Sequence, residues 1–158
     1  MLIVGFIVLG MIAVALMVFI EYAHDVFPEN ITVSADGETT STLPVRDLQL
    51  IPTEAREYSV NLVCEASGDY DVFLDFTETS DGQMKHFVDV TVRLNGEQVY
   101  KGKLSELLDG EKIIEFECTL EADDPNVITF SYLMPHDTGN EAMGTYADFD
   151  TKLTIKKI

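Results

Sequence analysis

The segment from Tyr132 to Asp150, YLMPHDTGNEAMGTYADFD, gathers groups that could do chemistry: one histidine, four acids, two glycines and a proline. A histidine acts as a general base only when a positioned partner lies within hydrogen-bond reach. His24, His86 and His136 are far apart, and none has a second His or Cys at metal-ligand spacing. The chain also lacks an H-E-x-x-H motif, a nucleophile elbow, a phosphate-binding loop and a dinucleotide fingerprint. We therefore expect no catalytic residues and predict that the protein is not an enzyme.

Three pairs of acids are the candidates for binding a metal. Calcium favours clustered carboxylates and backbone carbonyls, but the chain has no complete loop of calcium-ligand spacing. We expect solvated polar faces and no cofactor, with weak calcium binding as the alternative. The pairs are Asp69 with Asp71, Asp123 with Asp124, and Asp148 with Asp150.

The two cysteines, Cys64 and Cys118, both fall on the apolar phase of alternating segments. Cysteines on facing strands of an extracellular domain can form a disulfide. Sequence spacing does not show whether their β-carbons face each other. A disulfide and two buried free thiols therefore remain equal alternatives.

The charge of the chain limits its partners. Ten Lys and Arg residues stand against 28 Asp and Glu residues, a net charge of −18, and residues 1–20 contribute none of it. A domain this acidic repels DNA, RNA and anionic lipid headgroups. We expect no nucleic acid partner.

The first twenty residues, MLIVGFIVLGMIAVALMVFI, form an unbroken apolar run. About 20 such residues cross a bilayer as a helix, whereas a signal peptide has a basic start and a shorter apolar region. We predict that residues 1–22 are a transmembrane anchor in the lipid bilayer of the cell membrane, with the rest extracellular. If they are instead a cleaved signal segment, the domain is secreted.

The rest of the chain alternates between apolar and polar residues, which is typical of strands with one buried face. Asn95-Gly96 is a hairpin signal, and residues 103–108 read as one helical turn. Seven or more short strands predict an all-β, jelly-roll-like β-sandwich over residues 43–158, preceded by one N-terminal apolar helix. The expected strands cover residues 31–35, 58–64, 72–76, 88–94, 114–120, 128–134 and 147–155.

Residues 23–42 are predicted to be a linker, with a polar loop at 36–42. Ile31, Val33 and Ala35 give its middle part, VFPENITVSA, the alternation of a strand. A mobile strand of this kind can complete the sheet of a neighbouring subunit, and head-to-tail contacts that do not close make filaments. The alternative is that this strand pairs within its own domain.

The stretch from Tyr132 to Asp150 resembles the closing segment of the TasA/camelysin family of exported bacterial proteins. The hairpin VRLNGEQVYKGKLSELL fits the same family, and the resemblance covers residues 88–155 best. It implies a jelly-roll-like sandwich, export, and biofilm-matrix fibres as in the best-known members. Some members are called metalloproteases, an activity that we do not carry over because the chain has no protease motif. The matching residues are Pro135, Gly139, Asn140, Glu141, Gly144, Ala147, Phe149 and Asp150.

These observations lead to one favoured function and two alternatives. We expect an exported, membrane-anchored structural protein, a subunit of an extracellular matrix fibre or filament whose partners are other copies of itself. The first alternative is an accessory single-pass subunit that binds other membrane proteins. The second is a metal-dependent peptidase.

Overall fold

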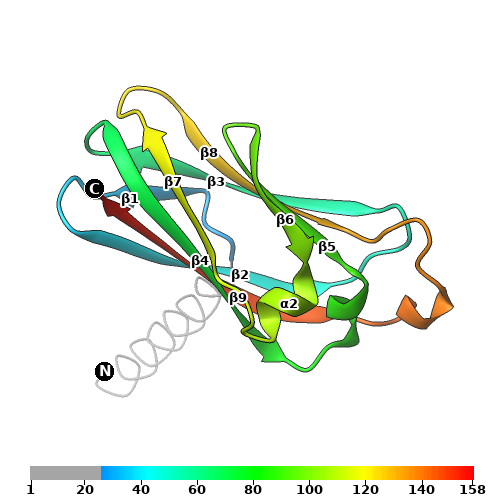
Figure 1. Cartoon of the computed structure of the whole chain (residues 1–158). Coiled ribbons are helices and arrows are strands. Elements are labelled where there is room, and N and C mark those ends of the chain that lie inside the picture. The colour runs from blue at the N-terminus through cyan, green and yellow to red at the C-terminus, as the bar shows by residue number, and fades with distance from the viewer. Residues whose placement is uncertain (1–25) are drawn as a thin grey trace, which may run out of the picture.

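The computed structural model describes residues 26–158 (Figure 1). The predicted anchor or signal segment, residues 1–22, lies outside the described residues. Between residues 26 and 158, no helix has the length and apolar character needed to cross a bilayer.

The described chain folds into two packed β-sheets, so the prediction of an all-β sandwich is confirmed (Figure 1). Sheet A has the strand order β1-β3-β8-β5-β6, and sheet B has the order β2-β9-β4-β7. Every pairing is antiparallel except that of β1 with β3, which is parallel. The strands are β1 (Asn30–Val33), β2 (Glu38–Leu48), β3 (Ala55–Cys64), β4 (Gly68–Ser80), β5 (Asp89–Leu94), β6 (Glu97–Lys103), β7 (Ile114–Leu120), β8 (Asn126–Leu133) and β9 (Ala147–Lys157).

The core lies between the sheets and is made by the apolar phase of each strand. Phe130 and Tyr132 of β8 and Phe149 of β9 are fully buried. The Tyr132 and Phe149 rings meet edge to face with centroids 5.4 Å apart. The alternation in the sequence thus marked the buried face correctly in the central strands.

The predicted turns and the short helix are also present. Asn95 and Gly96 join β5 to β6 with φ values of 50° and 83°, the left-handed backbone that a two-residue hairpin requires. The helix α2 (Leu104–Leu108) follows β6 and leads into β7, with Leu104 and Leu107 buried (Figure 1). Two 3-10 segments, η1 (Gln83–Phe87) and η2 (Asn140–Ala142), lie in the β4–β5 and β8–β9 connections.

The predicted polar loop at residues 36–42 is wrong, because β2 begins at Glu38 and pairs with β9. Its inward positions Thr39 and Ser41 are only half-buried, so the sequence shows no apolar alternation there. Strand β2 is also an edge strand, the position in a sheet where a proline such as Pro44 is tolerated. Both β1 and the start of β2 fall inside the predicted linker 23–42, so the sandwich begins before residue 43.

The other edge strand of sheet B, β7, also departs from expectation. Phe116 and Cys118 were predicted to be buried, but both are half-buried. An edge strand has a neighbour on one side only, so its inward residues are covered on one side only.

Candidate interaction surfaces

The N-terminal edge of sheet A is built by four residues of β1. Ile31 and Val33 point inward and are 7% and 0% exposed. Strand β1 runs parallel to Asn61–Cys64 of β3, and the ladder is extended at its two ends by Asn61 N–H donating to the Glu29 carbonyl and Glu65 N–H to the Val33 carbonyl. The predicted strand is therefore confirmed at Ile31 and Val33. Ala35 lies beyond its end, where its N–H donates to the Glu65 carboxylate at 2.9 Å.

Phe27 continues this edge before the strand begins. Its ring centroid lies 5.3 Å from that of Tyr58 and 6.0 Å from that of Phe130. The aromatic ring thus covers the side of the core that β1 is too short to reach. We call the strip of β3 from Asn61 to Cys64, together with the core beneath Phe27, Ile31 and Val33, the β1 slot.

The connection between β1 and β2 is short and hydrogen-bonded. It consists of residues 34–37, in which the Ser34 N–H donates to Thr39 Oγ1 at 2.9 Å and the Ser34 hydroxyl to the Asp36 carbonyl at 2.7 Å. The long loose tether predicted over residues 36–42 is therefore absent from this part of the chain. A short hinge between two sheets is the feature that favours exchange of a terminal strand between copies.

The segment from Tyr132 to Asp150 packs into the fold as a strand, a loop and a strand. The Met84 N–H of η1 donates to the Tyr146 carbonyl at 3.1 Å, and Thr145 Oγ1 donates to the Ala142 carbonyl at 2.6 Å. Ala142 is 2% exposed. The first contact ties the loop to the β4–β5 connection, and the second holds the loop to itself.

The residues that carry the family resemblance therefore have structural positions. Gly144 has a φ of 73°, so a glycine is favoured there, whereas Gly139 has a φ of −77° that any residue adopts. Ala147 and Phe149 are buried, and the Asp150 carboxylate pairs with the Arg46 guanidinium at 2.8 Å. Pro135, Asn140 and Glu141 lie in the loop, half-buried to exposed.

The candidate chemical groups do not converge. His86 and His136 are exposed on separate connections, and His24 lies outside the described residues. Across residues 26–158, no three His, Cys, Asp or Glu side chains are placed to hold a metal ion together. Three of the six acids predicted in pairs bind protein groups: Asp69 accepts from Thr119 Oγ1 at 2.7 Å, Asp148 accepts from the Asp47 N–H at 2.5 Å, and Asp150 pairs with Arg46.

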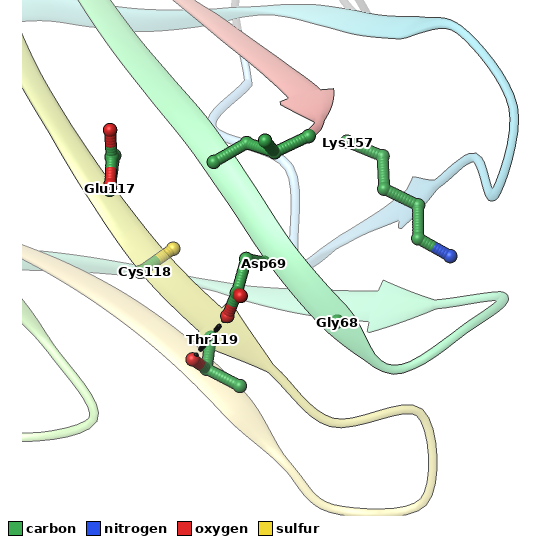
Figure 2. A pocket seen from close by; sticks show the side chains of 7 residues that line it. Gly68, Asp69, Glu117, Cys118, Thr119 and Lys157 are labelled. Carbon is green, nitrogen blue, oxygen red and sulfur yellow. Dashed lines mark hydrogen bonds between the residues drawn. The ribbon is translucent and has the colours of Figure 1, made fainter.

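An open depression of about 690 Å³ lies where β4, β7 and the end of β9 meet (Figure 2). Figure 2 shows Asp69, Glu117 and Thr119 along its wall, with the Asp69–Thr119 hydrogen bond drawn. Burial, with smaller contributions from Cys64, Asp69 and Asp71, raises the pKa of the Cys118 thiol from 9.0 to about 11. A thiol with that pKa stays protonated at neutral pH and is a poor nucleophile. The depression thus has acidic and hydroxyl groups but no activated nucleophile.

The two cysteines are free thiols. Cys64 is buried, with Asn126 Nδ2 donating weakly to its sulfur at 3.8 Å. Cys64 lies on β3 of sheet A and Cys118 on β7 of sheet B, where Cys118 is half-buried. Their disulfide stays a prediction.

Comparison with known proteins gives no family for this chain. No family model and no curated protein matches it. Among solved structures, it is similar to a β-glucosidase from Paenibacillus barengoltzii (13% identity, TM-score 0.39), of which it spans 11% while 78% of this chain is covered. It is also similar to the EclA C-terminal domain, a sugar-binding protein (16% identity, TM-score 0.38, 70% of this chain and 84% of that one), and to a family 35 carbohydrate binding module from Clostridium thermocellum (12%, 0.36, 77% and 92%). Likenesses this distant carry no argument about a ligand.

Sequence reasoning missed two features of these surfaces. Phe27 was not singled out, although an aromatic residue followed by Pro28 and an alternating strand is a recognisable signal. The other is that β1 spans only four residues of β3, which leaves residues 55–60 of β3 without a backbone partner on that side within the described chain. The length of a pairing partner cannot be read from one strand alone.

Proposed function

We propose that this protein is an exported, membrane-anchored structural protein whose β domain is a subunit of an extracellular matrix fibre or filament. The observation that carries the proposal is β1, a four-residue terminal strand at the edge of sheet A that completes the core of its own domain. A terminal strand joined by a short hinge can leave its own slot and fill the same slot in a neighbour.

The energetics of this exchange favour it at high concentration. Burying a Val, Ile or Phe side chain stabilises by roughly 1.5–3 kcal/mol, so the β1 slot is costly to leave empty. In an exchanged assembly Phe27, Ile31 and Val33 regain the same contacts in the next subunit. Local concentration then decides between the closed monomer and the exchanged form.

The geometry of the exchange leads to an open chain of subunits. A β1 strand given to one neighbour leaves the donor's own slot to be filled by a third copy, so the contact is head-to-tail. Head-to-tail contacts that do not close generate filaments. The resemblance to the TasA/camelysin family supports this proposal, as does the strand order, from which we infer a jelly roll of β2 to β9 with β1 added.

The anchor belongs to the same proposal. The uncharged run of residues 1–20 supports a segment retained in the bilayer, with the β domain outside the cell. Cleavage of that segment would release a secreted form with the same β domain. No catalytic role is proposed for any residue.

The experiment compares two soluble forms, residues 26–158 and residues 36–158. We expect the longer form to assemble into filaments as its concentration rises, and the shorter form to make no filaments and to melt at a lower temperature. Adding the peptide VFPENITVSA should raise the melting temperature of the shorter form, because the peptide fills the β1 slot. A longer form that is monomeric at every concentration, together with equal melting temperatures, would disprove strand exchange.

The accessory-subunit alternative has its own readout. If the protein is purified from native membranes in a mild detergent, a fixed stoichiometry with integral membrane proteins and no fibres would favour that alternative. Fibres on the cell surface without such partners favour the structural protein.

A further inference from the structure

The outward face of sheet A carries a basic strip in an otherwise acidic protein. The strand registers place Arg93 of β5 beside Gln98 of β6, Thr91 beside Lys101, and Asp89 beside Lys103. The same face continues over β8 and β3 with the hydroxyls of Ser131, Thr129 and Ser59, of which the last two are hydrogen-bonded at 3.0 Å. Its charged side chains are three cations and two acids, a local charge of +1: Arg93, Lys101, Lys103, Glu57 and Asp89.

Two of these cations have no acidic partner. Lys103 pairs with Asp89, but within residues 26–158 neither Arg93 nor Lys101 forms an ion pair. Acids outnumber Lys and Arg by 28 to 10 in this chain, so partners within the fold would be easy to supply. Unpaired cations here leave a surface that is free to meet acids from outside.

The outward face of sheet B has the opposite charge. The registers place Glu38, Lys156, Asp71 and Glu117 in one row across its four strands, with Phe73 and Glu115 in the next row. Only Arg46 and Asp150 form an ion pair among the charged residues of this face that the structure describes. The outward face of sheet B holds three cations and eight acids, a local charge of −5. They are Arg46, Lys152, Lys156, Glu38, Asp69, Asp71, Asp75, Glu115, Glu117, Asp148 and Asp150.

We propose that the outward face of sheet A binds the outward face of sheet B on a second copy of this chain. The contact uses neither β1 nor its slot, so it joins subunits sideways. This proposal rests on the proposed function only in that both proposals need copies of the chain to associate. Figure 2 shows part of the acidic partner face, with Asp69 on β4 and Glu117 on β7. The two faces belong to the same molecule and lie on opposite sides of the sandwich, so each copy can contact two others.

The size of the faces predicts a weak contact. Strands about 4.8 Å apart and about 3.3 Å per residue give a flat area roughly 20 Å by 20 Å. A stable pair of proteins usually buries about 800 Å² on each partner. One sideways contact is therefore weak, and it becomes effective when filaments repeat it many times.

A second copy fits the basic strip better than a polyanion does. Nucleic acids and other polyanions need several unopposed cations in a row, because binding comes from neutralising many phosphates or carboxylates. Here Glu57 and Asp89 interrupt the strip, and the net charge of −18 repels a polyanion as a whole. The acidic face of another copy offers a few acids at sheet spacing, which matches the strip.

The test is a charge swap in the full-length chain, kept in a non-ionic detergent and followed by sedimentation velocity. The A-face variant is Arg93→Glu with Lys101→Glu, and the B-face variant is Asp71→Lys with Glu117→Lys. By the same count the A-face variant has faces of −3 and −5, which repel, and the B-face variant has faces of +1 and −1, which attract less than +1 and −5 do. We therefore expect the midpoint concentration for association to rise in both variants, by roughly tenfold or more in the A-face variant. In the mixture, the unchanged sheet A face of the B-face variant (+1) can meet the unchanged sheet B face of the A-face variant (−5), so association should return as pairs of unlike copies.

Matched controls change the net charge equally at sites off both faces. Lys112→Glu with Arg56→Glu adds four negative units, as the A-face variant does. Glu111→Lys with Asp137→Lys adds four positive units, as the B-face variant does. The mixture of these two controls should behave like the wild type and like each control alone. If a reversed pair does not fold, Lys101→Gln and Glu117→Gln each remove one charge and should weaken association in the same direction.

The outcomes separate this proposal from strand exchange. Weaker association of each variant alone, with recovery of association in the mixture, supports the sideways contact, whether or not the peptide VFPENITVSA has any effect. Variants that associate like the wild type, or a mixture that recovers nothing, overturn it, even if thin filaments still form through β1. Fluorescent polyglutamate that binds the wild type and the B-face variant but not the A-face variant would assign the strip to an acidic polymer and also overturn it. Salt alone does not decide, because it screens both the attraction between faces and the repulsion between copies.

Discussion

Two segments of this protein have roles opposite to those that their residue types suggest. The segment from Tyr132 to Asp150 is rich in groups that do chemistry, yet its side chains hold a loop against η1 and close the core. The segment from residue 26 to residue 35 has almost no such groups, yet Phe27, Ile31 and Val33 form the edge on which the proposed assembly depends. Position in the topology, rather than residue type, separates the two.

The difference follows from what surrounds each segment. Strand β9 lies between β2 and β4, so Phe149 is enclosed by neighbours on both sides and by Tyr132 across the core. Strand β1 has one neighbour, β3, and it is joined to the rest of the domain through residues 34–37. A central strand is held by the whole sandwich, whereas the first strand of the sandwich, at a sheet edge, can leave it as a unit.

The largest expected effect tests the structural role of the C-terminal segment. Phe149→Ala should destabilise the domain by about 3–5 kcal/mol, because it removes a fully buried ring from the centre of the core. Met143→Ala, in the same segment but 70% exposed, should change stability by less than about 0.5 kcal/mol. Urea unfolding of residues 26–158 measures both. Equal losses would mean that the loop and the strand are not distinguished by burial.

The contrast between centre and edge also explains which parts of the fold the sequence predicted. Val90, Val92, Phe130 and Phe149 alternate with polar neighbours because their strands have one face on the core, so the pattern is strong. Strand β2 gave no such pattern, because an edge strand of Thr and Ser residues needs little apolar burial. Phe116 of β7 has the right phase but a half-buried position for the same reason.

The candidate surfaces were harder to predict than the strands. Alternation shows that Arg93 and Lys101 point away from the core, but it does not show that they share a face. That depends on the register of β5 with β6, where a bulge between Val92 and Arg93 shifts the pairing by one residue. The slot beside β3 depends in the same way on how far β1 extends along it. Pairing between distant segments is a property of the whole chain, and local sequence patterns do not contain it.

A second, smaller effect tests the N-terminal edge. Val33→Ala should cost about 1–2 kcal/mol in the monomer, less than Phe149→Ala because fewer atoms are removed and β1 can shift against β3. The same change should weaken concentration-dependent association, since Val33 fills the neighbour's slot after exchange. Val26→Ala, 59% exposed in the same segment, is the matched control and should alter neither property. A Val33→Ala protein that is destabilised but associates as the wild type does would separate β1 from assembly.

The smallest effect concerns the half-buried thiol of Cys118 on the edge strand β7. Folding raises the pKa of Cys118 from 9.0 to about 11, so the folded protein holds the Cys118 proton more tightly than the unfolded chain. The stability that comes from this difference is fully present below pH 9, and it is lost as the pH rises through about 11. Unfolding experiments between pH 8 and pH 11 should therefore show a decline in the free energy of unfolding that is shallower in Cys118→Ala than in the wild type.

Alkylation at neutral pH should modify Cys118 slowly, because little thiolate is present. If oxidation instead joins Cys64 to Cys118, the mass falls by two hydrogens, alkylation stops at both sites and the Cys118-dependent part of the decline disappears. Rapid alkylation of Cys118 at pH 7 in the folded protein would contradict its burial and its raised pKa.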